Sequence, residues 1–180
     1  FEPLKDLQQN KMKSASWYRN AVSLIADRSN PSDLFASGKL LGRPSAGRMS
    51  MFFYDPKFKQ RLPYYDTFPL VLPLEPMSGG FIGLNFHYLP YGARFKFLQQ
   101  LQRYASNKKF NQSTKILASY NSIKSNKYTK VAIKRYLYSQ VRSSFLRINV
   151  DEMALAAYLP VAQFQGRTLG GVFAAARKNF

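Results

Sequence analysis

The sequence contains no cysteine and a single histidine, His87, in 180 residues. The lack of cysteine excludes a disulfide-stapled fold, a zinc site with thiolate ligands and a thiol nucleophile. The sequence also lacks a run of eighteen apolar residues, so no transmembrane helix is predicted. Thiol-dependent chemistry and a transmembrane helix are therefore excluded.

Acidic residues are scarce as well: nine Asp and Glu stand against 27 Lys and Arg, which gives a formal net charge of +18. Hydrophobic residues nonetheless make up 46% of the chain and aromatic residues 16%. A disordered basic tail lacks this apolar surface, which is needed to offset the entropy of the chain. At this length we expect one folded domain with a strongly positive surface.

The shortage of carboxylates is concentrated in residues 76–150, which contain thirteen Lys and Arg and no Asp or Glu. Residues 1–75 and 151–180 carry net charges of only +4 and +1. A segment charged in this way repels itself unless a polyanion or an acidic subunit supplies the counter-charge. Nucleic acid is the first candidate, because its backbone presents dense phosphate. The alternative is a solvated basic face that only maintains solubility.

The chain divides into three parts. Residues 4–26 are expected to form one long N-terminal helix, which ends before Asn30-Pro31 because the residue before a proline avoids the helical region. Residues 31–48 are rich in Ser, Gly and Pro and are expected to form a loop or arm. The predicted parts are an N-terminal helix (1–30), an arm (31–48) and a core domain (49–180) with a basic helical segment (91–147).

The middle of the chain predicts strands at residues 49–54, 67–74 and 80–88, with Gly79-Gly80 as the turn before the third. Six of the ten prolines lie between residues 56 and 90. Because proline cannot donate to a central ladder, these strands are expected to be short, at sheet edges, or bent. We therefore predict an α+β fold, in which a small, twisted, proline-interrupted and mainly antiparallel sheet packs with several helices.

Two further helices are predicted at residues 91–104 and 168–179. In the first of them, Arg94, Lys96 and Arg103 are expected on the surface, and Phe95, Leu98 and Leu101 on the packed side. A short strand at residues 146–150 and a helix start at Asp151-Glu152 are also expected, because acidic residues are favoured at a helix N-terminus.

Residues 128–145 are predicted to form the most regular helix. Ile133, Leu137, Val141 and Phe145 recur every four residues, as the apolar face of an amphipathic helix does. A basic row is expected on an adjacent flank, formed by Lys127, Lys130, Lys134 and Arg142, with Tyr138 completing it.

Catalytic chemistry has few candidates. His87 lies in an apolar run without a second His or a Cys, so it is expected to pack or hydrogen-bond within the sheet. Asp55, Asp66 and Glu75 are the carboxylates that a metal-dependent nuclease would need, but the first two stand where turns begin. The glycine-containing loop at residues 37–45 lacks the Gly-Lys-Ser/Thr of a P-loop. No metal and no cofactor are expected.

Aromatic residues lie beside basic ones in Phe52-Phe53-Tyr54, Tyr64-Tyr65 and Phe95-Lys96-Phe97. Such rings serve as base-stacking platforms in single-strand binders. Most rings in a domain of this size belong to the core, however, and we expect that role for most of these.

Three sequence blocks identify a protein family more specifically than the composition does. Residues 51–57 read Met-Phe-Phe-Tyr-Asp-Pro-Lys, residues 62–71 read Leu-Pro-Tyr-Tyr-Asp-Thr-Phe-Pro-Leu-Val, and residues 80–90 read Gly-Phe-Ile-Gly-Leu-Asn-Phe-His-Tyr-Leu-Pro. With Lys134-Arg135-Tyr136-Leu137 and Tyr158-Leu159-Pro160-Val161, they resemble the DNA end protector family of T-even-related and marine (cyanophage-type) myoviruses. The resemblance covers residues 49–178.

The resemblance implies a non-enzymatic virion protein that binds the ends of linear double-stranded genome DNA. Such a protein would enter the host cytoplasm with the DNA and block exonuclease at the termini. One alternative is a structural component of the phage neck, tail hub or baseplate, whose basic face contacts acidic protein subunits. The other is the metal-dependent nuclease. The expected partners are accordingly double-stranded DNA ends and other virion proteins of the neck, hub or portal region.

Affinity for DNA is expected to come from basic side chains that contact phosphates and so carry no base specificity. The predicted DNA-binding residues are Lys108, Lys109, Lys115, Lys124, Lys127, Lys130, Lys134, Arg135 and Arg142.

Overall fold

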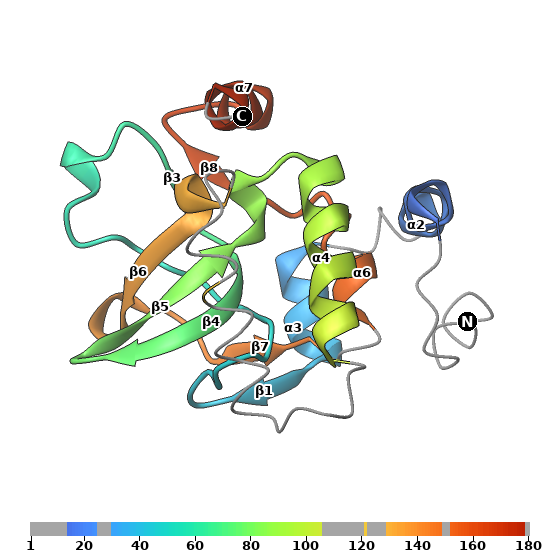
Figure 1. Ribbon diagram of the computed structural model, residues 1–180. Coiled ribbons are helices and arrows are strands. Elements are labelled where there is room, and N and C mark those ends of the chain that lie inside the picture. The colour runs from blue at the N-terminus through green and yellow to red at the C-terminus, as the bar shows by residue number, and fades with distance from the viewer. Residues whose placement is uncertain (1–13, 25–29, 106–120, 122–128, 149–151, 179–180) are drawn as a thin grey trace.

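The computed structural model describes residues 14–24, 30–105, 121, 129–148 and 152–178, and its fold is α+β (Figure 1). A six-stranded sheet has the strand order β1-β7-β2-β4-β5-β6, and β3 and β8 form a second, two-stranded sheet. Neighbouring strands pair antiparallel, which confirms the expected class. The strands are β1 (Lys39–Leu41), β2 (Ser50–Met51), β3 (Tyr65–Asp66), β4 (Leu70–Met77), β5 (Gly80–Asn85), β6 (Ile133–Leu137), β7 (Phe145–Arg147) and β8 (Phe164–Gln165).

The prolines of β4 lie where the sheet can accept them. Within β4, only Leu70 and Val71 pair with β2, so the rest of β4 has a strand on one side only. On the open side the carbonyl of Pro73 accepts a hydrogen bond from the Gly47 N–H at 2.8 Å. The register then shifts between Pro73 and Glu75. The expected bend is therefore confirmed, and the missing proline N–H does not interrupt the pairing with β5.

The turn between β4 and β5 depends on two glycines with different roles. Gly79 has a φ of 72°, in the left-handed region that favours glycine, as predicted for this turn. Gly80 begins β5 against β6, and a Cβ there would lie 1.9 Å from the carbonyl oxygen of Tyr136. The hairpin and its close approach to β6 both depend on the absence of a side chain.

The sheet bends around a small aromatic core. Val141, which follows β6, forms a bridge to Tyr54, which follows β2. The Tyr54 hydroxyl also accepts a hydrogen bond from the Leu137 N–H at 3.1 Å. The residues that follow β2 therefore contact the end of β6 and the residues that follow it. The rings enclosed in this way are Phe52, Tyr54, Phe81, Tyr136 and Phe145.

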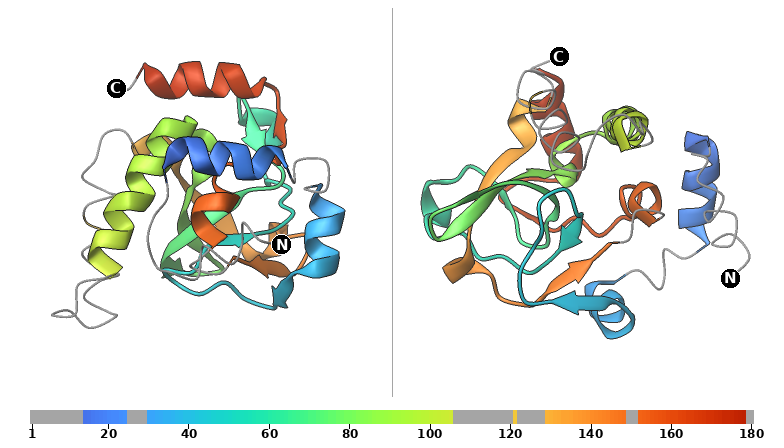
Figure 2. Two further views of the ribbon diagram at one scale, coloured as in Figure 1. Left: turned by 90° about the vertical axis from the view of Figure 1, so that its right-hand side faces the viewer. Right: turned by 60° about the horizontal axis from the view of Figure 1, so that its bottom comes forward.

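The main core lies between the sheet and the helical layer. Leu72 and Leu84 of the sheet share it with Phe97 and Leu98 of one helix, and each is at most 6% exposed. Figures 1 and 2 show α4 and α6 on one side of the sheet, α2 outside α6, and α7 across one end. The helices are α2 (Ala15–Ser23), α3 (Pro31–Ser37), α4 (Tyr91–Ala105), α6 (Met153–Ala156) and α7 (Leu169–Arg177).

The two helices predicted at residues 91–104 and 168–179 are confirmed as α4 and α7. Thr168 is the N-cap of α7, and its hydroxyl accepts a hydrogen bond from the Gly171 N–H at 3.2 Å. The predicted strand at residues 146–150 corresponds to β7, and α6 begins at Met153 after Glu152, as expected from the acidic pair. Asp151 lies outside the described residues.

The prediction of one long N-terminal helix at residues 4–26 is wrong. Ser14 has an extended backbone, and its hydroxyl accepts a hydrogen bond from the Trp17 N–H, so it is the N-cap of a helix that begins at Ala15. A helix from residue 4 cannot pass through this cap. Residues 1–13 and 25–29 lie outside the described part of the chain.

The arm predicted at residues 31–48 is also wrong, because it contains α3 and β1. Asn30-Pro31 begins a helix instead of ending one. The Asn30 side chain accepts a hydrogen bond from the Asp33 N–H at 3.0 Å, and Pro31 occupies the first helical position. Proline is favoured there because its fixed φ suits a helix and its missing N–H would have no partner in the helix.

The helix predicted at residues 128–145 is wrong as well. The chain there forms η5 (Lys130–Ala132), β6, η6 (Tyr138–Gln140) and then β7. A spacing of four residues places side chains on one face of a strand as well as on one face of a helix, because four is a multiple of two. The β-branched and aromatic residues of the segment and its pairing with β5 decide in favour of a strand.

Arg94 of α4 is buried, not at the surface as predicted. Only 1% of it is exposed. Its guanidinium donates to the carbonyls of Leu89 at 2.7 Å, Ala157 at 2.8 Å and His87 at 3.3 Å. The cation also lies 4.5 Å from the ring centroid of Tyr91. Burial lowers the pKa of Arg94 to about 10, so the group remains charged near neutral pH.

Replacing Arg94 by methionine is expected to lower the free energy of unfolding by about 3 kcal/mol or more, because three buried carbonyls lose charged donors. Urea unfolding measures the change. Lys96→Met on the exposed side of the same helix is the matched control, with an expected effect within about 0.5 kcal/mol. Equal losses in the two variants would contradict a stabilising role for the buried cation.

Candidate nucleic-acid interface

Four of the nine predicted DNA-binding residues lie in the described part of the chain. Lys130 is exposed in η5, Lys134 and Arg135 lie on β6, and Arg142 is exposed between η6 and β7. The other five lie outside the described residues, namely Lys108, Lys109, Lys115, Lys124 and Lys127.

The four described cations do not form the predicted helical row. Lys134 and Arg135 are neighbours on a strand, so their side chains leave opposite faces of the sheet. The Lys134 ammonium lies 4.1 Å from the ring centroid of Tyr88, and burial lowers its pKa. Arg135 is exposed and its Nε lies 3.0 Å from the sulfur of Met77. Of the two, Arg135 is the more accessible to a phosphate.

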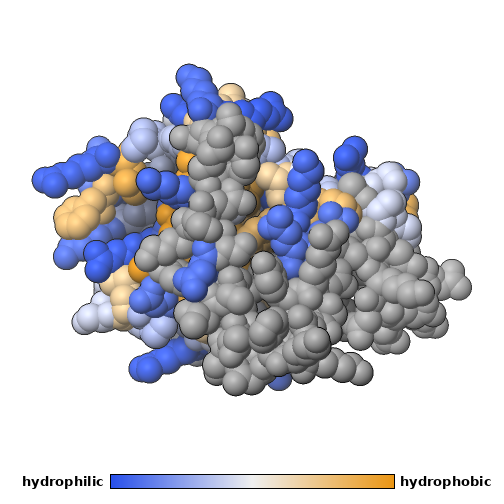
Figure 3. All heavy atoms as spheres, viewed as in Figure 1, coloured by the Kyte–Doolittle hydropathy of each residue, from blue (hydrophilic) through white to orange (hydrophobic). Residues whose placement is uncertain are grey.

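A loop outside the predicted DNA-binding residues adds further cations. The segment from Asp55 to Tyr64 connects Tyr54 with β3 and projects from the molecule as the teal segment at the left of Figure 1. Its exposed tip includes η3 (Lys59–Arg61) and the exposed side chains of Phe58 and Leu62. Figure 3 shows mainly hydrophilic side chains at this end, with hydrophobic ones among them.

Arg142, Lys134 and Arg167 border this loop. The carboxylate of Asp55, at the start of the loop, lies 2.8 Å from Lys59 and 3.8 Å from Arg142. At the other end of the loop, the Tyr64 ring lies 4.5 Å from the Arg167 guanidinium and 5.8 Å from the Tyr88 ring that Lys134 covers. We call the resulting group the basic end; its members are Lys57, Lys59, Arg61, Lys134, Arg142 and Arg167.

The electrostatics of the basic end suit an anionic partner. Two of its six cations, Lys59 and Arg142, pair with the carboxylate of Asp55, whose pKa is lowered mainly by its hydrogen bond to Lys59. The same hydrogen bond raises the pKa of Lys59. Exposed ion pairs of this kind contribute little to stability because solvent screens them. The positive charge that remains is available to contact phosphates.

The three carboxylates considered as metal ligands lie in different surroundings. Asp55 pairs with Lys59 at the surface, Glu75 is exposed on β4, and Asp66 is buried. Within the described part of the chain, no three His, Asp or Glu side chains form a group that could hold a metal ion. The ligand set that a nuclease would need from these residues is therefore not assembled.

His87 hydrogen-bonds in the core, as predicted, although it belongs to η4 (Phe86–Tyr88) and not to a strand. Its Nδ1 lies 2.8 Å from Oδ2 of Asp66, which also accepts a hydrogen bond from the Asn85 amide at 3.0 Å. Oδ1 of Asp66 accepts from the Phe68 N–H at 3.0 Å, as a turn-forming aspartate does. These contacts join β3, β5 and η4 inside the core.

The rings beside basic residues are mostly in the core, as expected. Phe52, Tyr54 and Phe97 are at most 8% exposed, and Phe53 and Tyr64 are partly buried. The exposed ring on the projecting loop is Phe58, at 56%. Phe58 was not among the rings predicted beside basic residues.

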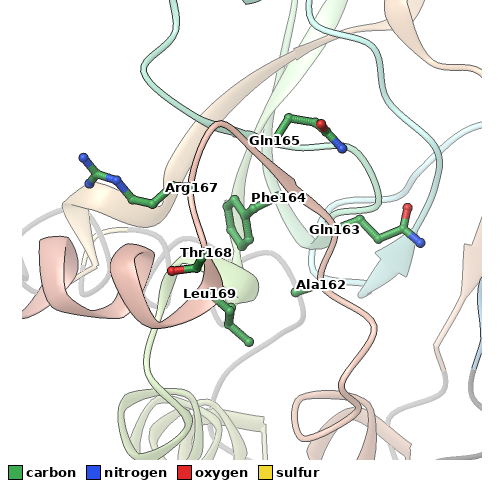
Figure 4. A pocket seen from close by; sticks show the side chains of 7 residues that line it. All are labelled: Ala162, Gln163, Phe164, Gln165, Arg167, Thr168 and Leu169. Atoms are coloured by element: carbon green, nitrogen blue, oxygen red, sulfur yellow. The ribbon is translucent and has the colours of Figure 1, made fainter.

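A shallow pocket of about 370 Å³ lies at the start of α7. Figure 4 shows that the side chains of Arg167 and Gln163 point to opposite sides of it, with Phe164 between them. Polar groups therefore do not converge on one point, as they do in a built small-molecule site. Its lining residues are Ala162, Gln163, Phe164, Gln165, Arg167, Thr168 and Leu169.

None of the helices in the described ranges is long and apolar enough to cross a membrane.

The α+β fold and its exposed cations define a small basic protein suited to an anionic polymer. The chain belongs to the family of the phage T4 terminal DNA protecting protein, whose model matches residues 6–178. No curated protein and no solved structure matches it significantly. The family match confirms the resemblance noted in the sequence and extends it to nearly the whole chain. This is a bacteriophage family of DNA-binding, end-protecting proteins.

The burial of His87 predicts a pH dependence of stability. Burial, which outweighs the attraction of Asp66, lowers the pKa of His87 below its ordinary value of about 6.5. Histidine in the unfolded chain therefore takes up a proton first as the pH falls, so the unfolded state binds more protons. The contribution of His87 to the free energy of unfolding should be fully present above about pH 6.5 and should be lost as the pH falls below that value.

Urea unfolding at several pH values tests this expectation, with His87→Gln as the comparison. The variant is expected to be less stable throughout, but its free energy of unfolding should depend less steeply on pH below about pH 6.5. An unchanged slope in His87→Gln would show that another group carries the pH dependence.

Proposed function

We propose that this protein binds the termini of linear double-stranded phage DNA and shields them from exonuclease, without catalysing a reaction itself. The observation that carries the proposal is the match of residues 6–178 to a family described by protection of terminal DNA. The exposed cations of the basic end support it, because they supply contacts to phosphates. The separate positions of Asp55, Asp66 and Glu75 leave the nuclease alternative without a set of metal ligands among the residues that the structure describes.

The proposal implies where the protein acts. A protein that occupies the ends of the packaged genome resides in the virion and enters the host cytoplasm with the DNA. Its protein partners would then be virion components near the portal, neck or tail hub. If the basic charge instead contacted acidic virion subunits as its main task, the purified protein would bind those subunits and not DNA ends.

Digestion of linear duplex by a double-strand exonuclease tests the proposal directly. The purified protein is expected to slow degradation of a blunt duplex, and the protection should decrease steeply as salt rises because counterions are released on binding. A nicked circle attacked by an endonuclease serves as the control, since shielding of ends would leave its cleavage unchanged. Failure to protect the linear duplex at low salt would contradict the proposal, and degradation by the protein alone with Mg²⁺ would indicate a nuclease.

The described cations that the sequence predicted remain proposed phosphate ligands. Neutralising Lys130, Arg135 or Arg142 with glutamine is expected to weaken binding to all duplexes and to reduce the slope of log affinity against log salt by about 1 in each single variant. Arg19→Gln is the matched control, because Arg19 is exposed on α2, at the opposite side of the molecule from the projecting loop in Figure 1. A salt slope that is the same in all four variants would remove these residues from the interface.

A further inference from the structure

Phe58 occupies an unusual position for a large apolar side chain. It is 56% exposed, and it lies on the projecting loop. The groups that cover its faces are cations: the Lys57 ammonium lies 5.4 Å and the Arg61 guanidinium 5.7 Å from the ring centroid. Burying a phenylalanine side chain stabilises a folded protein, and this ring forgoes most of that gain.

The loop that carries Phe58 is held in shape by its own hydrogen bonds. The N–H of Lys59 donates to the carbonyl of Pro56 at 3.3 Å, and the N–H of Arg61 donates to that of Phe58 at 3.0 Å. Where the loop begins, the N–H of Asp55 donates to the carbonyl of Gln140 at 3.0 Å. Pro56 and Pro63, on either side, have φ angles fixed by their rings. The Phe58 ring is therefore presented on an ordered support.

Phosphate contacts alone cannot select a DNA end, since every turn of a duplex presents the same phosphates. What an end has and the interior lacks is an uncovered face of a base pair. A flat ring can stack on that face without separating two base pairs, and stacking tolerates any base. An exposed ring among three cations, Lys57, Lys59 and Arg61, combines the two kinds of contact that an end requires.

We propose that Phe58 stacks on the terminal base pair of a duplex end while Lys57, Lys59 and Arg61 contact the phosphates of the last nucleotides. This inference rests on the proposed function and adds the residue that distinguishes an end from continuous duplex. The cations now lying against the ring would shift toward the phosphates on binding. Asp55 would keep its position beside Lys59 and Arg142 and orient the loop.

The test compares Phe58→Ala with the wild-type protein on two DNA molecules of one sequence, a blunt linear duplex and a dumbbell whose ends are closed by hairpin loops. The wild-type protein is expected to bind the blunt duplex about tenfold or more tightly than the dumbbell. Phe58→Ala should bind both with the affinity that the wild-type protein has for the dumbbell. Phe58→Trp should restore the preference, because the indole also stacks.

Leu62→Ala is the matched control, since Leu62 is an exposed apolar side chain on the same loop, at 43%. It should leave the preference for blunt ends unchanged. A 2-aminopurine at the terminal position should be quenched by the wild-type protein and by Phe58→Trp but not by Phe58→Ala, while one at the centre of the duplex should not respond. Both alanine variants alter exposed side chains, and their thermal unfolding should match that of the wild-type protein.

The outcomes separate the two proposals. If the wild-type protein prefers blunt ends and Phe58→Ala keeps that preference, the stacking proposal is wrong and the proposed function stands. If the wild-type protein shows no preference for blunt ends, both fail. An unchanged preference for blunt ends in Phe58→Ala, together with loss of its binding to isolated virion proteins, would assign the ring to a protein contact instead.

Discussion

The arrangement of the fold depends on one buried cation. Arg94 of α4 joins the carbonyls of His87 and Leu89, which follow β5, to the carbonyl of Ala157, which follows α6, and lies 5.5 Å from the ring of Phe173 in α7. These segments share no strand pairing, so the guanidinium fixes the helical layer to the sheet. His87 takes part twice, since its side chain contacts the buried carboxylate of Asp66. The buried guanidinium and the buried carboxylate therefore both have partners inside the core, as the burial of a charge requires.

Local signals in the sequence were sufficient for the elements whose chemistry is local. Gly79 marked the hairpin, Thr168 marked the start of α7, and the prolines of β4 marked a bend. Contacts between segments that are distant in the sequence could not be predicted from periodicity. The spacing of Ile133, Leu137 and Val141 fits a helix and a strand equally, and the partner strand β5 decides between them. Arg94 is indistinguishable in sequence from a surface cation, because its partners are backbone carbonyls of distant segments.

The charge of the candidate site follows from the sequence, but its geometry does not. The scarcity of carboxylates predicts a basic surface, and the structure places Arg135 and Arg142 in exposed positions. A helical row was inferred from a spacing that belongs to a strand, which places Lys134 and Arg135 on opposite faces. The projecting loop has no periodicity at all, so Phe58 resembles any other core ring until its exposure is known. Alternation of Lys57, Phe58 and Lys59 between two prolines was the available signal.

The bend of the sheet has a consequence for how copies of the protein behave beside one another. The two edge strands, β1 and β6, span three and five residues, and Tyr54 and Val141 return to the outer side of the longer one. Unpaired strand edges are the usual templates for aggregation, and short or covered edges deny that template to a second chain. Net charge of +18 adds mutual repulsion. At high local concentration, copies of the protein are therefore expected to remain separate and not to join edge to edge into extended sheets.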